Sequence, residues 1–147
     1  MTTTDSPSLQ ERLDRLASFL PVFEAPGFTF AIWQASKESE PGVFTMPNCI
    51  LSEPASEFIH TAYAMEWVLP DFDWPSWKDT PEARQLRDDP DALRRATVVQ
   101  LARLLTVLIR QDRYIEGALA GAYDSGLLTA ILRRADVLRR EIEDEGT

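Results

Sequence analysis

The fold is decided by the stretch Asp91-Ala-Leu-Arg-Arg-Ala-Thr-Val-Val-Gln-Leu-Ala-Arg-Leu-Leu-Thr-Val-Leu-Ile-Arg110, which carries the strongest helical pattern in this chain of 147 residues. Its apolar residues recur at helical spacing and, as at Leu104/Leu105 and Val107–Ile109, occupy most of the helix circumference. A helix that is apolar on nearly every side must be buried. With Asp91 as N-cap, the pattern predicts a helix over residues 92–110 at the centre of the molecule.

Two further helices are expected before this segment. Ser6 as N-cap and Pro7 at the first helical position begin a helix whose leucines share one face and which ends at Pro21. Ser52 repeats the cap signature and opens a second helix, whose apolar residues keep helical spacing up to Leu69 and which ends before Pro70.

Two short runs between these helices favour strands. Residues Phe28–Trp33 are mostly aromatic or β-branched, and Val43–Met46 form a second run after the polar loop Lys37–Gly42. Together they predict a small two-stranded β-hairpin near the N-terminus.

The connector Asp71-Phe-Asp-Trp-Pro-Ser-Trp-Lys-Asp-Thr-Pro81 combines two prolines with two tryptophans. The prolines block regular structure, while Trp74 and Trp77 offer a large apolar area for docking. We expect a connector that wraps over the core.

The C-terminal third continues in helical pieces. The central helix can break at Gln111-Asp112, with Asp112 as the cap of a new segment through Tyr123, or it can continue through this position. Ser125-Gly126 allows another break before a helix from Leu127 to about Glu143. The chain is therefore predicted to be mainly α, a single compact helical domain of four to five helices with the small hairpin. The domain covers residues 8–140, between a flexible N-terminus (1–7) and an acidic C-terminal tail (141–147).

Charge and cysteine content exclude several classes of protein. The net charge is −9, from 15 basic and 24 acidic side chains, which opposes binding to nucleic acid or to an anionic membrane surface. Neither an export signal nor a transmembrane segment is visible. Cys49 is the single cysteine, so no internal disulfide can form, and a cytoplasmic location is expected.

The densest patch of unusual residues is the block Arg110-Gln-Asp-Arg-Tyr-Ile-Glu-Gly117. With Ser125-Gly126, the downstream Ile131-Leu-Arg-Arg134 and the tryptophan-rich connector, this block resembles the domain-of-unknown-function family DUF6508, a family of small, mostly bacterial proteins. The resemblance covers roughly residues 16–134. It supports the domain boundaries, and it implies no activity, cofactor or catalytic residue.

The same block has a physical interpretation. Gly117 and Gly121 lie four apart among alanines, a small-residue face on which close packing is the favoured role. Arg113 and Glu116 lie at helical spacing, so an ion network would account for both, but together with Asp112 they could also bind a small polar ligand.

Polar residues also line one stripe of the central helix: Gln100, Arg103, Thr106, Arg110 and Arg113. This stripe is either the solvent face of the helix or an anion-binding wall, since the guanidinium group suits carboxylate and phosphate. We expect Arg110 and Arg113 to share one hollow with their acidic neighbours.

Other candidate sites are weaker. Glu57 and His60 form half of a di-metal motif, but His60 is the only histidine, so no metal site is predicted. The aspartates of the connector are more simply explained as caps and turn residues. Phosphate-loop motifs are absent and Cys49 has no local catalytic signature, so no cofactor is expected.

Two functions remain open. The preferred one is a non-catalytic module that binds a protein partner, a second copy of the chain included, or a small polar ligand. Its ligand-binding residues are Arg110, Asp112, Arg113, Glu116, Trp74 and Trp77. The alternative is an enzyme of unrecognised type, a hydrolase or transferase acting on a phosphorylated or nucleotide-like ligand, with Asp112 or Glu116 as base.

Overall fold

The segment predicted as one central helix forms two helices, α6 (Pro90–Arg94) and α7 (Val98–Asp112), in a computed structural model that describes residues 6–44 and 48–145. The break has a local cause. The Thr97 hydroxyl accepts the Gln100 N–H and the Gln100 side chain accepts the Thr97 N–H, a capping box that begins a new helix. Asp89, not Asp91, caps α6.

The helices of the N-terminal half also begin and end at other residues than predicted. Ser8, not Ser6, caps α1 (Leu9–Ala17), and a separate short helix α2 (Leu20–Phe23) follows. Helix α3 (Glu53–Ala64) ends well before Leu69. Glu66 adopts a φ of 62°, and the Trp67 N–H donates to the Ala62 carbonyl, so a Schellman turn ends this helix.

The connector contains helices that the sequence did not predict. Asp73 caps the short helix α4 (Trp74–Trp77), and Thr80 caps α5 (Pro81–Asp88). In both helices the proline lies in the first turn. Backbone N–H groups there have no partner within the helix, so a proline costs no hydrogen bond. Prolines that were expected to block structure therefore start it.

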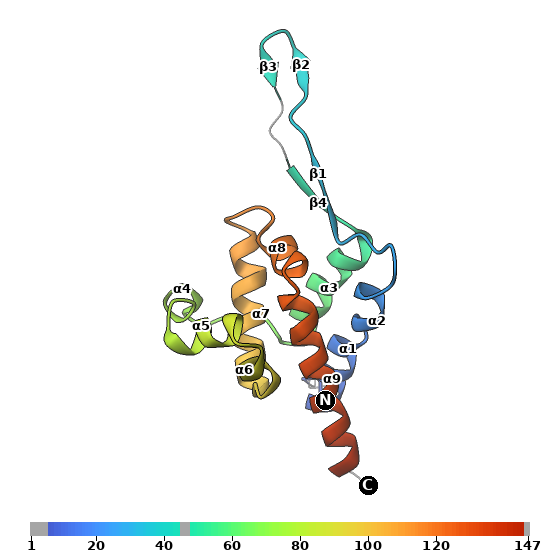
Figure 1. Cartoon of the computed structure of the whole chain (residues 1–147), viewed down its shortest axis with the longest axis vertical. Helices are drawn as coiled ribbons and strands as arrows, with labels where there is room; N and C mark the ends of the chain where they lie inside the picture. The colour runs from blue at the N-terminus through green and yellow to red at the C-terminus, as the bar shows by residue number, and fades with distance from the viewer. Residues whose placement is uncertain (1–5, 45–47, 146–147) are drawn as a thin grey trace, which may run out of the picture.

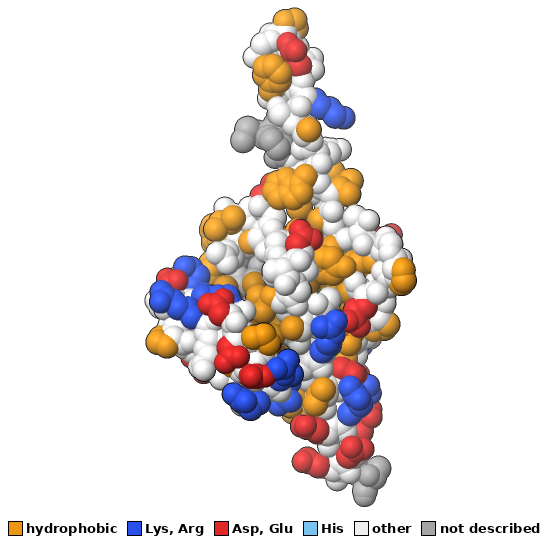
Figure 2. All heavy atoms as spheres, in the orientation of Figure 1, with side chains coloured by type: hydrophobic (Ala, Val, Ile, Leu, Met, Phe, Trp, Pro, Cys, Tyr) orange, Lys and Arg blue, Asp and Glu red, His pale blue; other side chains and the backbone are white. Residues whose placement is uncertain are grey.

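The N-terminal strands form an arm that projects away from the helices (Figure 1). Strand β1 (Ala31–Gln34) pairs antiparallel with β4 (Asn48–Leu51), and β2 (Glu38–Glu40) with β3 (Val43–Phe44) farther out. The run Val43–Met46 was expected to pair with the first strand, but β1 pairs with the later segment β4. Val43 and Phe44 form β3, while Thr45 and Met46 lie outside the described residues. Figure 2 shows hydrophobic side chains along this arm.

The chain ends in two helices, α8 (Ala118–Asp124) and α9 (Leu127–Glu145). Residues 141–145 of the predicted acidic tail belong to the end of α9. The prediction of a mainly α protein is confirmed, but the described residues form more helices, α1 to α9, than the four to five expected. Within this part of the chain, no helix has both the length and the apolar character needed to cross a membrane.

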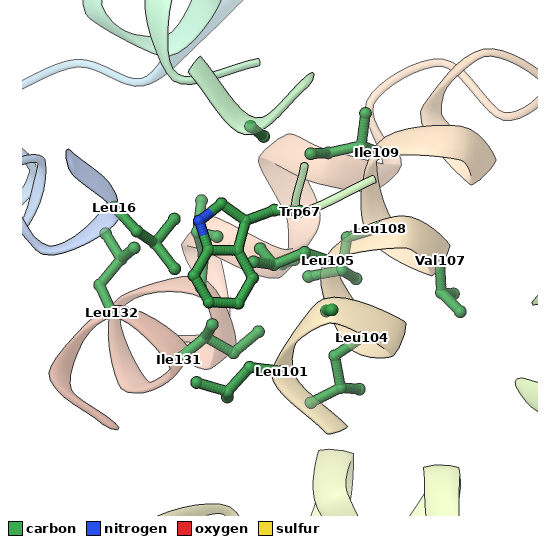
Figure 3. Packing of buried hydrophobic residues seen from close by; sticks show 14 of the residues in the cluster. Leu16, Trp67, Leu101, Leu104, Leu105, Val107, Leu108, Ile109, Ile131 and Leu132 are labelled. Atoms are coloured by element: carbon green, nitrogen blue, oxygen red, sulfur yellow. The ribbon is translucent and has the colours of Figure 1, made fainter. Parts of the chain in front are cut away.

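The core lies between α1, α7 and α9, with Trp67 at its middle (Figure 3). Trp67 is fully buried, and its indole N–H donates to the Arg12 carbonyl at 3.1 Å. Leu16, Leu101 and Ile131 come from the three helices around this ring and are also fully buried. The predicted burial of the 98–110 segment is correct, since most of its side chains face this core.

Candidate functional site

The polar stripe of α7 holds the connector in place. The Gln100 amide donates to Glu82 at 3.1 Å, and the Arg103 guanidinium lies 3.4 Å from the same carboxylate and 5.6 Å from the Phe72 ring. Thr106 is fully buried and accepts the Leu69 N–H at 2.9 Å. These three residues of the stripe thus bind protein groups, and Arg103 stays partly exposed.

The two arginines at the end of the stripe line different hollows. Helix α7 ends at Asp112, and Arg113 is its C-cap. Arg110 lines a hollow of about 650 Å³ together with Arg12 and Tyr63. Arg113 lines a different hollow, of about 400 Å³. The expectation of one hollow shared by both guanidinium groups is wrong.

The connector tryptophans lie in the core. Trp74 and Trp77 are both buried, and the Trp77 indole N–H donates to Glu82 at 2.7 Å. The Trp74 ring lies 6.2 Å from the Tyr114 ring, which is the one ring contact between the connector tryptophans and the 110–117 block in the described part of the chain. Neither tryptophan lines the hollow of Arg113.

Asp112, Arg113 and Glu116 do come together, and the arm meets them there. The hollow of about 400 Å³ is lined by these three residues with Tyr114 and Gly117, and by Cys49 and Leu51 from β4. The Glu116 carboxylate accepts the backbone N–H of Cys49. The Asp112 carboxylate accepts the Leu119 N–H at 3.0 Å and so caps α8 from the preceding helix, although Gly117 is the N-cap.

Gly117 is the second anchor of the arm. Its φ is 88°, and a Cβ built there would lie 2.8 Å from Cη2 of Trp33 and closer still to Cζ2. The indole of Trp33, in β1, thus rests directly on the glycine. Close packing is the role predicted for Gly117, but Gly121 has open space where its side chain would stand. The predicted small-residue face is reduced to one glycine.

Cys49 is partly buried at this hollow, beside several carboxylates. Burial raises its pKa, and the carboxylates of Asp112, Glu116 and Asp124 raise it further. A thiol needs a lowered pKa to react as thiolate. His60 is exposed on α3, and among the residues described here no group of three or more His, Cys, Asp or Glu side chains could hold a metal ion.

Sequence reasoning missed the apolar surface of the arm. Ile32 is 55% exposed, Trp33 58%, Phe44 62%, and Val43 and Ile50 are exposed as well. Tyr114 and Ile115 are exposed in the loop that receives the arm. The run of aromatic and β-branched residues in β1 is the available signal, but by itself it indicates only a strand. We call these seven residues the arm surface.

Comparison with known proteins gives one match. Residues 8–141 match the family described as a family of unknown function (DUF6508). Neither a curated protein nor a solved structure matches the chain.

Proposed function

The chain belongs to the family DUF6508, and we propose that it is a protein-interaction module that contacts its partner through the arm surface. The observation that carries the proposal is the exposure of Ile32, Trp33, Val43, Phe44 and Ile50 on a narrow projection. Apolar side chains gathered on one exposed element mark interaction sites in proteins.

The construction of the arm supports this role. A two-stranded hairpin is at best marginally stable in water, so β1 and β4 need further contacts. The body supplies two at the base, the Glu116 carboxylate on the Cys49 N–H and Gly117 beneath Trp33. The outer pair, β2 and β3, has none of these supports, yet it carries the most exposed large hydrophobic side chain of the arm, Phe44.

The 110–117 block then belongs to the interaction site as its base. Tyr114 and Ile115 lie between the arm anchors and the end of α7, and they extend the apolar surface from the arm onto the body. Asp112 and Glu116, the bases that an enzyme would use, each accept a backbone N–H instead. This use of both carboxylates favours binding over catalysis.

The experiment is site-specific photocrosslinking in cells of the source organism. A benzophenone side chain is placed at Phe44, and a matched variant carries it at Val99, an apolar residue of the body that is 55% exposed. We expect a discrete adduct from position 44 that disappears when Val43→Asp is added, and none from position 99. The same adducts from both positions, or none from position 44, would refute the proposal.

Self-association is measured alongside. Sedimentation at rising concentration compares the wild type with Phe44→Ser. If the arm binds a second copy, the adduct has twice the mass of the chain and the serine variant stays monomeric. An adduct of another mass with a monomeric wild type identifies a different protein partner.

A further inference from the structure

We propose that the hollow between α1, α3 and the end of α7 binds an organic anion, a carboxylate or phosphate joined to an apolar group. This site is separate from the arm surface. It has a volume of about 650 Å³, within the range of small-molecule sites. Two arginines, Arg12 and Arg110, line it.

Arg110 is the group that an anion would engage. Its Nε atom is buried and has no hydrogen-bond partner among the described residues. No ion pair of Arg110 occurs among them either, although Arg103, on the same helix, reaches a carboxylate. The two Nη groups of a guanidinium form a planar fork that matches two oxygens of a carboxylate or phosphate, and those of Arg110 are not among the buried atoms. Arg110 thus offers its Nη groups at the edge of the hollow, with the buried Nε behind them.

Arg12 is held in place beside it by the chain. Its Nε donates to the Met65 carbonyl at 2.7 Å and one Nη to the Glu66 carbonyl at 3.0 Å, while the guanidinium lies 4.5 Å from the centre of the Trp67 ring. These contacts are to neutral groups, so the positive charge of Arg12 is not cancelled by them. The Schellman turn at Glu66 is what aims both carbonyls at this arginine.

The remaining walls favour an apolar body on the ligand. Val68, Leu69 and Pro70 form one side, and the Leu69 backbone is fixed by its hydrogen bond to Thr106. Tyr63 is partly exposed at the rim and presents a phenol, which can both stack and donate a hydrogen bond. Glu66 is the one acid in the lining, so the hollow carries two positive charges and one negative in a protein of net charge −9.

The ligand class follows from these walls. An inorganic ion would use the arginines but leave the apolar side uncovered, and a neutral apolar molecule would leave the Arg110 fork without an acceptor. A molecule that joins an anionic head to an aromatic or aliphatic group satisfies both.

The test is NMR titration of the full chain at ~0.15 M salt, where exposed charges are largely screened. The probes are phenyl phosphate, benzoate, inorganic phosphate and benzyl alcohol. We expect the Arg110 Nε–H signal to shift on addition of phenyl phosphate or benzoate, and whichever binds more tightly identifies the head group. Equal affinity for inorganic phosphate would mean an adventitious ion only, and no shift of the Arg110 signal with any probe would overturn the proposal.

Matched variants distinguish the contribution of the guanidinium hydrogen bonds to binding from that of the positive charge. Arg110→Gln should weaken binding of the better probe by roughly tenfold or more, since a charge-assisted hydrogen bond is lost. Arg110→Lys keeps the charge without the fork and should restore only part of that loss. Arg84→Gln removes an equal charge from an exposed position on α5 and should leave binding unchanged. Equal losses in Arg84→Gln and Arg110→Gln would show non-specific attraction and refute the site.

Discussion

Replacement of Gly117 by alanine most directly tests the contact between the arm and the helical body. The residue has a φ of 88°, where an alanine pays about 1–2 kcal/mol for left-handed backbone. The new methyl group would also overlap the Trp33 indole, so the ring must move. Gly117→Ala should therefore lower the free energy of unfolding by more than the backbone cost alone.

The free-energy cost of displacing the Trp33 ring follows from its burial. The residue is 58% exposed, which leaves 42% of its surface covered. For a tryptophan that is on the order of 100 Å², worth about 2.5 kcal/mol if the ring were lifted off entirely. With partial displacement of the ring, Gly117→Ala should cost about 2–4 kcal/mol in total.

Two other glycines provide matched controls. Gly126 has the same φ of 88° but open space around it, so Gly126→Ala reports the backbone cost alone, about 1–2 kcal/mol. Gly121 lies inside α8 with neither constraint, and Gly121→Ala should stabilise the helix by up to about 1 kcal/mol.

The assay is urea unfolding of the three variants, with hydrogen exchange of the Cys49 amide as a local measurement. In the Gly117→Ala protein this amide should exchange faster, because the displaced Trp33 loosens β1 and β4. If Gly117→Ala costs no more than Gly126→Ala, or if the Cys49 amide keeps its protection, Trp33 does not rest on Gly117 and the account of the arm is wrong.

Three further measurements test other contacts. Thr106→Val removes the acceptor of the Leu69 N–H and should lower the free energy of unfolding in urea by about 1–3 kcal/mol. Thr106→Ser keeps the acceptor and should cost less. Equal costs would show that this hydrogen bond does not stabilise the fold. The hydrogen bond from Trp77 is the main cause that lowers the pKa of Glu82, so its charged form stabilises the fold above about pH 4.5. That contribution disappears as the pH falls through the lowered folded pKa, and Glu82→Gln should lose less stability on acidification than the wild type. Burial and nearby carboxylates raise the pKa of Cys49, so iodoacetamide should alkylate it more slowly at about pH 8 in the native protein than in urea; equal rates would contradict this environment.

Local signals account for much of the helical structure. The apolar pattern predicted the burial of α7, and the sequence also contains the capping box at Thr97 and Gln100 that divides this helix from α6. The apolar pattern alone continues to Ala92 and so does not show this division. Likewise, Thr80 followed by Pro81 is a local start signal for α5.

The pairing of the strands and the surroundings of the two arginines could not be predicted from such local signals. The spacing of Arg110 and Arg113 is that of one helix face, but the helix ends between them, and each arginine lines a different hollow. Strand β1 pairs with β4 and not with the nearer β3, because the chain between them forms a second antiparallel pair of its own. Both outcomes depend on residues distant in sequence.

Local patterns predict that this chain is mainly helical and that the segment around Leu104 and Leu105 is buried, since helical periodicity and apolar character are properties of neighbouring residues. The packing of the whole chain places Trp33 on Gly117, Glu116 on the Cys49 backbone, and Arg110 beside Arg12 at one hollow. These are contacts between segments far apart in the chain, and their geometry depends on how the whole core packs, which no local pattern records.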